Sequence, residues 1–358
     1  MPKVAINLVT WNGAKQIEAC LNSILEQSFQ DFLLLIIDNG SVDQTVKIIE
    51  EEYLPAFKDK IKFVKNKSNL GFAFAHNQAI LWTDSDYVLV LNQDVILQPN
   101  YIAKAVEFMD KHHGIGSVTG KILRWETNEL NDLKKIQKSG IIDSLGLKIY
   151  KSQRVVDRAS GEPAYASADA KALADKEASA GRQNENITEI FGPCATCPIY
   201  RRKALEDVRF EDEFFDNDFF SYQEDIDLAY RLVWRGWPSY YLPEAIAYHE
   251  RTVKGQEKFS NLTIVRHRRN KSKFVNYHSY KNHLFLLYKN LSRRNFWRYF
   301  FSIFFYELKK FCYIFFFEYS TLGSLTEFFS LRKRMKIKRH YIMSRRLIKD
   351  DEMRKWLN

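Results

Sequence analysis

Short apolar runs alternate with longer segments of helical periodicity along the first third of the chain. The apolar runs predict β-strands over residues 4–9, 32–37, 61–64 and 87–91. The segments between them repeat apolar residues every three or four positions, which predicts helices over residues 14–27, 42–53, 72–83 and 100–112. Strands that alternate with helices are typical of an α/β fold, so we expect a mainly parallel sheet flanked by helices.

The residues that follow each predicted strand are polar or turn-forming. They occupy positions 10–12, 38–41, 66–71 and 92–94. Ligands of doubly wound sheets bind at the carboxyl ends of the strands. We therefore expect the functional site at this edge of the sheet.

The chain changes character between residues 150 and 190. Residues 159–181 are rich in Ala, Ser, Gly, Asp and Lys and contain few large apolar side chains, which predicts a mobile surface loop over 150–190. The alanines and lysines of residues 164–180 also suit a helix, and propensity does not decide between the two. Apolar structure resumes at residues 187–191 and continues in a predicted helix over 223–236.

The tail, from about residue 276, is dense in aromatic residues, above all over 296–306 and 311–317. A membrane-spanning helix needs about 20 predominantly apolar residues, but Glu307, Lys309 and Lys310 interrupt this stretch. We therefore expect helices that lie in the membrane interface rather than span it. The alternatives are an aromatic-rich homodimer interface and a helical layer packed on the rest of the chain.

Charge is distributed unevenly along the chain. Residues 1–250 hold 28 Lys/Arg and 37 Asp/Glu, whereas residues 251–358 hold 26 and 7. The positive tail, with basic clusters at residues 266–271 and 332–339, would attract the headgroups of an anionic membrane surface. No recognisable nucleic-acid-binding fold accompanies these clusters, so we expect no nucleic-acid partner.

Composition is typical of a globular protein in a reducing compartment. Of the 358 residues, 46% are hydrophobic, which excludes a disordered chain. The four cysteines are too few for a disulfide framework, and for Cys194 and Cys197 we favour buried thiols over zinc or redox chemistry. The N-terminus shows no secretory signal pattern. We predict a globular domain over 1–255 and a basic, aromatic helical region over 256–358, peripheral to a membrane.

One carboxylate, Asp94, follows a buried apolar strand across a short polar tip. Divalent cations such as Mg²⁺ and Mn²⁺ prefer oxygen ligands, and an aspartate at the end of a strand suits such a site. A single carboxylate is a weak motif, however, and an ordinary turn aspartate is the alternative.

Three acidic residues, Glu224, Asp225 and Asp227, gather at the start of the predicted helix over 223–236. The helix dipole favours the ionised form of acids there, and an ionised carboxylate can remove a proton from a hydroxyl group. Helix capping is the alternative. For Asp227 we prefer an ion pair with Arg231 one turn later, and for Glu224 and Asp225 both interpretations stay open.

The order of the motifs over about residues 3–290 resembles that of family 2 glycosyltransferases, most closely their bacterial rhamnosyltransferase-like members. The motifs occupy residues 9–12, 37–43, 69–73, 91–94, 191–193, 199–202 and 224–228, and residues 236–237, 242–243 and 247–249 follow the same pattern. The ordered combination is far more specific than any single motif. It implies a GT-A fold and an inverting transfer of a sugar from a nucleoside diphosphate donor.

The resemblance assigns donor-binding roles to residues at the strand ends. Thr10 and Asp38 would contact the nucleoside, with Asp38 hydrogen-bonding the pyrimidine or its ribose. Gly71 would let the backbone approach the ligand closely. The remaining donor-site residues would be Asn12, Asn69 and Asn92.

The resemblance also assigns the chemistry. Asp94 matches the last acid of the DxD motif that holds Mg²⁺ or Mn²⁺, and Asp225 matches the catalytic base, with Glu224 supporting the acceptor. His249 falls where related enzymes place a metal or diphosphate ligand, and a merely structural histidine is the alternative. Asn92 departs from the pattern because it replaces the first acid of DxD. This change would weaken metal binding or transfer part of it to His249.

A donor such as dTDP-rhamnose or a UDP-hexose and a lipid-linked or cell-surface glycan acceptor fit this resemblance. The enzyme would work on the cytoplasmic face of the cell membrane, and loop 150–190 would close over the substrates. A sugar-phosphate nucleotidyltransferase or a dinucleotide-dependent dehydrogenase would need a glycine-rich loop that residues 10–13 do not form. A non-catalytic membrane-bound scaffold of the same fold is the other alternative, against which the retained Asp94, Glu224 and Asp225 argue.

Overall fold

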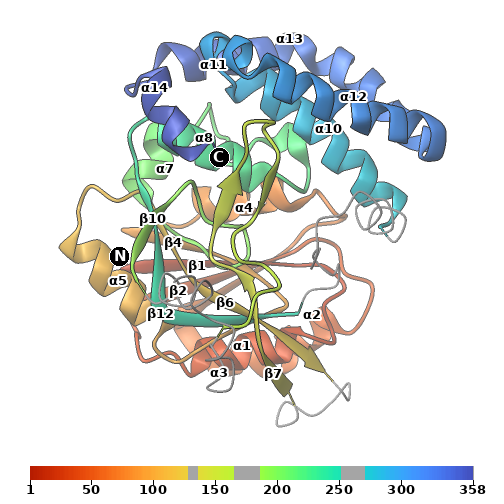
Figure 1. The fold of residues 1–358 in the computed structure, drawn as a ribbon. Helices are drawn as coiled ribbons and strands as arrows, with labels where there is room; N and C mark the ends of the chain where they lie inside the picture. Colours follow the sequence, from red (N-terminus) through yellow and green to blue (C-terminus); the bar gives the residue numbers. More distant parts are fainter. Residues whose placement is uncertain (128–135, 165–185, 251–270, 358) are drawn as a thin grey trace, which may run out of the picture.

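The structure is a computed structural model that describes residues 1–127, 136–164, 186–250 and 271–357 (Figure 1). Within these residues a ten-stranded sheet has the order β10-β12-β6-β11-β4-β1-β2-β3, with β5 paired to β12 and β7 paired to β6. Helices cover the sheet, and a layer of C-terminal helices is stacked across one end of the molecule (Figure 1).

The parallel half of the sheet holds the first four strands. They are β1 (Val4–Thr10), β2 (Phe32–Asp38), β3 (Ile61–Lys65) and β4 (Tyr87–Asn92). β1 lies between β2 and β4 and pairs with both in parallel register. Its apolar side chains are buried on both faces, and full burial of one such side chain contributes about 1.5–3 kcal/mol.

Four helices coincide with predicted ones: α1 (Ile17–Leu25), α4 (Phe72–Leu81), α5 (Tyr101–Lys111) and α8 (Glu224–Trp234). The helix predicted over 42–53 begins at Thr45 and continues to Phe57. Its successive segments are α2 (Thr45–Ile48), the π-helical η1 (Ile49–Tyr53) and α3 (Leu54–Phe57), and the 3₁₀ turn η2 (Lys58–Lys60) follows. Pro55 accounts for the π-helical turn before it, because proline has no N–H to donate to the preceding turn.

The second half of the sheet is mixed. Its strands are β5 (Val95–Leu97), β6 (Ser117–Thr127), β7 (Ile136–Ser144), β10 (Thr188–Ile190), β11 (Ile199–Arg201) and β12 (Ser239–His249). β8 (Leu147–Ile149) and β9 (Val155–Asp157) form a separate pair, and α7 (Arg202–Val208) and η5 (Asn217–Phe219) lie between β11 and α8. Because β12 pairs with β5, His249 lies opposite Val95 and next to Asp94 in the fold.

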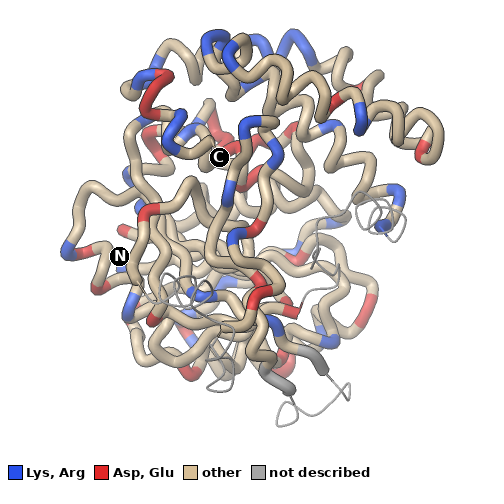
Figure 2. The backbone as a smooth tube through the Cα atoms, in the orientation of Figure 1, with Lys and Arg blue, Asp and Glu red and all other residues tan. Residues whose placement is uncertain are grey.

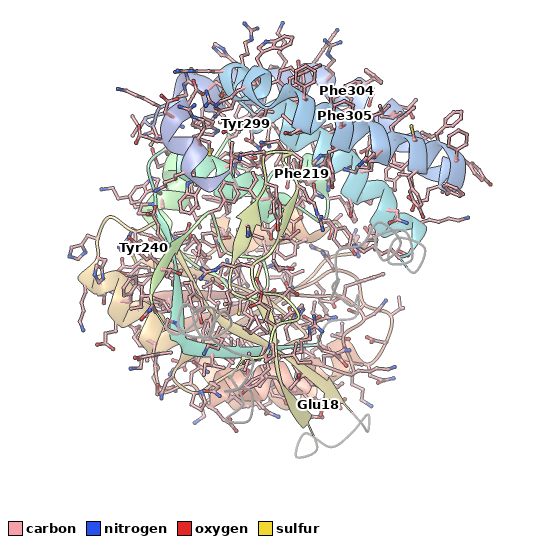
Figure 3. The ribbon with its side chains drawn as sticks, viewed as in Figure 1. Glu18, Phe219, Tyr240, Tyr299, Phe304 and Phe305 are labelled. Atoms are coloured by element: carbon pink, nitrogen blue, oxygen red, sulfur yellow. The ribbon has the colours of Figure 1, made fainter. Side chains whose placement is uncertain are left out.

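The C-terminal layer begins with α10 (Lys273–Asn290), α11 (Arg293–Arg298) and α12 (Phe300–Phe317). It continues with η6 (Tyr319–Leu322), α13 (Gly323–Ser344), α14 (Asp350–Met353) and η7 (Arg354–Trp356). α10 and α13 contact each other and α8, and Lys and Arg recur along the layer (Figure 2). Phe304 and Phe305 lie on its outer helix, at the opposite end of the molecule from Glu18 (Figure 3).

Two predicted features lie partly outside the described residues. Of the predicted loop over 150–190, residues 165–185 are not described, and the described part contains β9 and β10. Of the basic cluster over 266–271, only Lys271 is described. In the described part of the chain, no helix is long and apolar enough to cross a bilayer.

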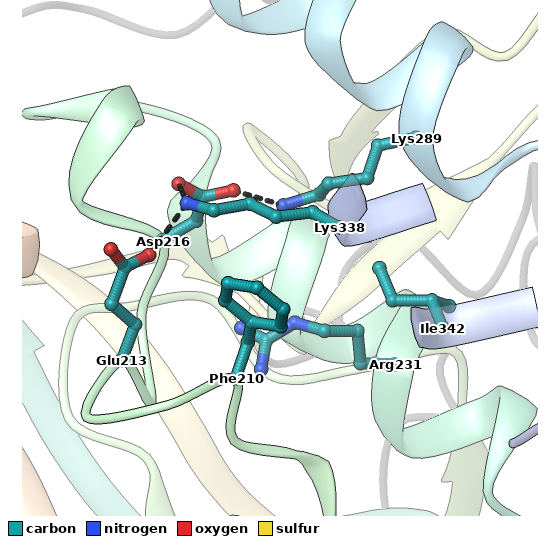
Figure 4. A pocket seen from close by; sticks show the side chains of 7 residues that line it. All are labelled: Phe210, Glu213, Asp216, Arg231, Lys289, Lys338 and Ile342. Atoms are coloured by element: carbon teal, nitrogen blue, oxygen red, sulfur yellow. Dashed lines mark hydrogen bonds and ion pairs between the residues drawn. The ribbon is translucent and has the colours of Figure 1, made fainter. Parts of the chain in front are cut away.

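A buried ion network joins the C-terminal layer to the chain that leads into α8 (Figure 4). Lys338 of α13 binds Glu213 at 2.6 Å and Asp218 at 2.8 Å, and it also binds Asp216. Lys289 of α10 binds the other oxygen of Asp216. Burial alone would raise the pKa of Asp216, but the two lysines hold it well below its usual range. The cavity inside the network measures about 10 Å³, too small for a ligand.

The network corrects the sequence-based interpretation of the basic cluster over 332–339. Arg334 binds Glu213 and Asp218, and Lys338 is 2% exposed. Arg339 donates to the backbone carbonyls of Tyr288 and Leu291. About half of the basic residues of the cluster therefore make contacts within the fold, whereas Arg332, Lys333 and Lys336 are exposed.

The network generates a prediction about stability. Lys338→Ala should lower the free energy of unfolding by about 3 kcal/mol or more, because it removes one partner from carboxylates that stay buried. Urea unfolding of the full chain measures this loss. Lys336→Ala is the matched control on the exposed side of α13 and should change the free energy by no more than about 0.5 kcal/mol. Equal effects of the two substitutions would show that the network does not stabilise the fold.

Candidate active site

The carboxyl ends of β1, β2 and β4 bring predicted donor-site residues to one edge of the sheet. Thr10 lies opposite Asp38 in the pairing of β1 with β2, and Val9 lies opposite Asn92 in the pairing of β1 with β4. The parallel strands therefore bring these residues together at one edge of the sheet, and their role as a binding site stays a prediction.

Gln93 ties the end of β4 to the end of β1. Its Oε1 accepts hydrogen bonds from the Thr10 hydroxyl at 2.6 Å and from the Trp11 N–H at 2.8 Å. A Cβ atom at Gly13 would lie 2.3 Å from this oxygen, so a larger residue at position 13 would displace the Gln93 side chain. Sequence reasoning did not select Gln93, because its partners lie more than 80 residues away.

Asp38 organises the turn that follows β2. Its carboxylate accepts hydrogen bonds from the Gly40 N–H at 3.1 Å and from the Ser41 N–H at 3.0 Å. Asn12 joins this turn to the loop after β1, since its Oδ1 accepts from the Val42 N–H at 2.9 Å. The role of Asp38 and Asn12 toward a nucleoside stays a prediction, while their role in shaping the edge is visible.

Asn69 and Gly71 shape the loop before α4. The Asn69 Oδ1 accepts from the Gly71 N–H at 2.9 Å. Gly71 has a φ of 86°, and a Cβ atom there would lie 2.6 Å from the carbonyl oxygen of Phe220. The close approach that Gly71 permits within the chain is therefore to the backbone just before α8.

Asp94 faces His249, as the pairing of β5 with β12 requires. The Asp94 Oδ2 lies 3.4 Å from the His249 Nε2, and the His249 Nδ1 lies 2.8 Å from the Asp143 Oδ2. Asp143, on β7, is fully buried. Sequence reasoning missed it, because it lies 106 residues from His249. Its carboxylate fixes the orientation of the imidazole so that Nε2 points at Asp94.

The two carboxylates around His249 favour the protonated, positively charged form of its imidazole. Burial alone would lower the pKa of His249, but the carboxylates of Asp94 and Asp143 raise it to about 10. The Asp94 Oδ1 is buried and has no hydrogen-bond partner among the described residues. The Asp94 carbonyl oxygen accepts from the Glu250 N–H at 3.0 Å and from the Trp125 Nε1 at 3.2 Å, which holds the loop in place.

Asp225 lies at the first turn of α8, as predicted. Its Oδ2 accepts from the Ala195 N–H at 3.1 Å, and its Oδ1 accepts from the Ile226 N–H at 2.8 Å. Burial raises the pKa of Asp225 to about 6, although both N–H groups favour the charged form. Burial and the adjacent Asp225 raise the pKa of Glu224 well above its usual range.

Asp227 has the structural role that we preferred for it. The Arg231 Nε donates to its Oδ2 at 2.9 Å. Its Oδ1 lies 2.6 Å from the Lys289 Nζ and accepts from the Asn290 Nδ2 at 2.7 Å. Asp227 is therefore buried in the contact with the C-terminal layer. Asp225, two residues earlier, is only half-buried.

One segment lies between the two acidic groups of the site. The Thr196 carbonyl accepts from the Asn92 N–H at 3.1 Å, and the neighbouring Ala195 N–H donates to Asp225. The strand end that carries Asp94 is therefore joined to the start of α8 through two consecutive residues. Cys194 and Cys197, in the same segment, are buried free thiols.

The protein ligands for a cation are few. In the described ranges, no group of three or more His, Cys, Asp or Glu side chains is arranged to hold a metal ion. Asp94 offers one oxygen ligand, and His249 would offer one nitrogen ligand once a cation displaced the proton that the neighbouring carboxylates favour on the imidazole. The other positions around a divalent cation would be filled by a diphosphate and water, as is usual for Mg²⁺.

Comparison with known proteins is consistent with this geometry. The family model described as "Glycosyl transferase family 2" matches residues 6–209, more than half of the chain. A teichoic acid poly(glycerol phosphate) polymerase of Staphylococcus epidermidis is 34% identical over 94 residues, which are 26% of this chain and 13% of that protein. Chondroitin synthase of Escherichia coli is 30% identical over 118 residues, which are 33% of this chain and 17% of that protein. The matches thus cover a minor part of these curated relatives.

The fold is shared with a solved enzyme structure. GalNAc-T7, crystallised with UDP, GalNAc and Mn²⁺, superposes with a TM-score of 0.57 at 13% identity, and the match covers 81% of this chain and 49% of that one. At this level of identity the likeness shows the fold alone, which is the predicted GT-A fold. From the family match together with the fold, we conclude that the chain belongs to glycosyl transferase family 2.

Proposed function

We propose that this chain is an inverting, metal-dependent glycosyltransferase in which Asp225 is the catalytic base. The observation that carries the proposal is the position of Asp225 at the start of α8. Asp225 accepts a hydrogen bond from the Ala195 N–H, and the next residue, Thr196, accepts one from Asn92, two residues before Asp94. Its pKa of about 6 is suited to a base that works near neutral pH.

The proposed reaction is a single displacement. Asp225 removes the proton of an acceptor hydroxyl, whose oxygen forms a bond to the anomeric carbon while the bond from that carbon to the diphosphate oxygen breaks. Attack from the face opposite the leaving group inverts the anomeric centre. We assign to Glu224, whose pKa is raised by burial and by Asp225, the support of the acceptor.

Asp94 and His249 are the proposed ligands of Mg²⁺ or Mn²⁺. The fit rests on the buried Asp94 Oδ1, which has no hydrogen-bond partner among the described residues, and on the His249 Nε2 that Asp143 directs toward Asp94. A cation held there would supply Lewis-acid stabilisation of the departing diphosphate. Asn92, in place of an acid, leaves Asp94 as the one carboxylate of its motif.

The donor would bind along the strand ends. We assign contacts with the nucleoside to Thr10 and Asp38, and the rest of the donor site to Asn12, Asn69, Gly71 and Asn92. A rhamnose or another hexose on a nucleoside diphosphate is the proposed donor. UDP accompanies GalNAc-T7 in its structure, and the names of the matched relatives refer to teichoic acid and chondroitin, which supports a cell-surface or lipid-linked glycan as acceptor.

The outer face of α12 is the proposed contact with the membrane. Most of its 18 residues are exposed, and only Ile303 and Ile314 are buried. Phe301 and Phe316 are each 72% exposed. The exposed large apolar side chains of α12 are Phe301, Phe304, Phe305, Leu308, Phe311, Phe315, Phe316 and Phe317. Such a helix would lie in the interface plane with its aromatic rings among the lipid headgroups.

Exposed basic side chains lie on α11 and α13, the α-helices that precede and follow α12 in the chain. Arg293, Arg294 and Arg298 are exposed on α11, and Arg332 and Lys333 are exposed on α13. Figure 2 shows that Lys and Arg recur on the helices next to α12. Each such charge near an anionic bilayer contributes about 1 kcal/mol. We therefore propose a peripheral enzyme on the cytoplasmic face of the membrane. The alternative is a homodimer that forms through α12, and the vesicle experiment below distinguishes the two.

The base assignment is testable once a donor is found by thermal shift of the full chain with nucleotide sugars and Mn²⁺. Asp225→Asn should lower kcat by about 100-fold or more, because the amide cannot accept the hydroxyl proton. The wild-type rate should fall about tenfold per pH unit below pH 6, where Asp225 becomes protonated. Asp212→Asn, an exposed acid ahead of η5, should leave kcat unchanged. A wild-type rate for Asp225→Asn would refute the assignment.

The metal assignment is tested by direct binding. His249→Ala should weaken Mn²⁺ affinity by about tenfold or more in calorimetric titration with nucleotide present, because it removes one of two protein ligands. Asp143→Asn should weaken it by about 10–100-fold through loss of ring orientation. His113→Ala, on an exposed histidine, provides the control. Unchanged affinity in His249→Ala would remove His249 from the site.

The membrane assignment is tested with vesicles that contain anionic lipid. The double substitution Phe305→Ser, Phe316→Ser should weaken sedimentation of the full chain with the vesicles by about 100-fold, since each buried ring contributes about 1.5–3 kcal/mol. The control is Leu81→Ser, Trp82→Ser, an exposed apolar pair at the end of α4. Unaltered vesicle binding would refute the assignment, and a wild-type dimer that the substitutions dissociate would assign α12 to a dimer interface instead.

A further inference from the structure

The chain immediately before Glu224 adopts a backbone conformation that is unfavourable for side chains other than glycine. Phe220, Tyr222 and Gln223 have φ angles of 63°, 72° and 68°. Each non-glycine residue held in such a region costs of the order of 1–3 kcal/mol, and it persists only where the surrounding structure enforces it. We refer to residues 219–223 as the base loop, because they lead directly into Asp225.

Asn282 of α10 holds the base loop in this conformation. It is fully buried. Its Nδ2 lies 3.0, 2.8 and 2.7 Å from the carbonyl oxygens of Phe219, Ser221 and Tyr222, respectively. Three acceptors fix the orientation of the amide, because a flipped side chain would turn its oxygen onto three other oxygens. A single side chain therefore gathers the carbonyl groups of the strained turn.

Neighbouring residues of α10 add to this contact. The Lys281 Nζ donates to the Asp218 carbonyl at 2.9 Å, and the Gln223 Nε2 donates to the Ser279 carbonyl at 3.2 Å. The rings of Phe220 and His278 stack at 5.3 Å. Figure 3 shows Phe219 between the C-terminal layer and the sheet. The base loop is thus bound to one face of α10 over its whole length.

The opposite side of the base loop contacts the proposed donor side of the site. The Phe220 carbonyl accepts from the Ala73 N–H at 3.2 Å. It is the same oxygen that a Cβ atom at Gly71 would approach to 2.6 Å. The loop therefore lies between α10 and the start of α4, so a shift of α10 would move the base relative to the strand ends.

We infer that Asn282 is a positioning residue for catalysis, and that α10 is part of the active-site framework rather than a separate membrane-binding appendage. The inference rests on the proposed role of Asp225. Without the Asn282 amide, the base loop is no longer held in its strained conformation, and Glu224 and Asp225 lose their fixed position. The strand ends at Thr10 and Asp38 do not depend on this contact, so nucleotide binding should persist.

The test compares Asn282→Ala and Asn282→Ser with Asn295→Ala in the full chain. Asn295 is a matched control, because it is also a buried asparagine of the C-terminal layer whose Nδ2 donates to one carbonyl, that of Asp350, at 3.1 Å. Amide hydrogen exchange over residues 217–226 should accelerate at least about tenfold in Asn282→Ala and less in Asn282→Ser, which keeps one donor. It should stay at the wild-type level in Asn295→Ala.

Kinetics supply the second measurement. In Asn282→Ala, kcat should fall by about 100-fold, the size expected for a small misplacement of a catalytic group, while the Kd for UDP or the donor's own nucleotide stays within about twofold. Unchanged exchange over 217–226, or equal losses of kcat in Asn282→Ala and Asn295→Ala, would overturn the inference. If the wild-type chain transfers no sugar, the proposed function fails, and the exchange data still decide whether Asn282 holds the loop.

Discussion

The burial of acidic side chains where the sheet meets the C-terminal helices is the constraint on which the rest of the structure depends. A buried carboxylate must gain a cation or take up a proton. Burial alone would raise the pKa of Asp216 and Asp227, but Lys289, Lys338 and Arg231 reverse the effect and lower the pKa values of both. Glu224 and Asp225 have no such cation among the described residues, and their pKa values are raised.

This difference divides the acids of one short stretch of chain into two kinds. Asp216 and Asp227 remain charged and fasten the C-terminal layer through Lys289. The pKa of Asp225 is about 6, close to neutral pH, because burial raises it while the two N–H groups that stabilise the charged form lower it. The ion pairs therefore do more than join two parts of the protein. They also hold α8 in place, and the first turn of α8 carries the half-buried Asp225, which we propose as the base.

The sequence predicted what depends on local pattern, and it failed where contacts are remote. The four parallel strands end within one residue of the predicted positions, since apolar runs and turn residues mark them. The GT-A fold is confirmed. The π-helical turn before Pro55 was not predicted, because apolar periodicity alone takes no account of a proline. Gln93, Asp143 and Asn282 carry no local signal, because their partners lie about 60 to 106 residues away. Charge pattern likewise could not tell the inward Lys338 from the outward Lys336.

The proposed membrane-facing surface and the proposed catalytic base are linked through adjacent residues of α10. His283 follows Asn282 in sequence, and its Nε2 lies 2.7 Å from the Glu307 Oε1 of α12. α12 is thus fixed to α10 at the same turn that holds the base loop. On our proposal that α12 lies in the lipid interface, this contact sets the orientation of Asp225 relative to the bilayer. Because an acceptor attached to a lipid is presented at a fixed depth, a rigid connection between the docking helix and the base loop would favour reaction at one hydroxyl group over others.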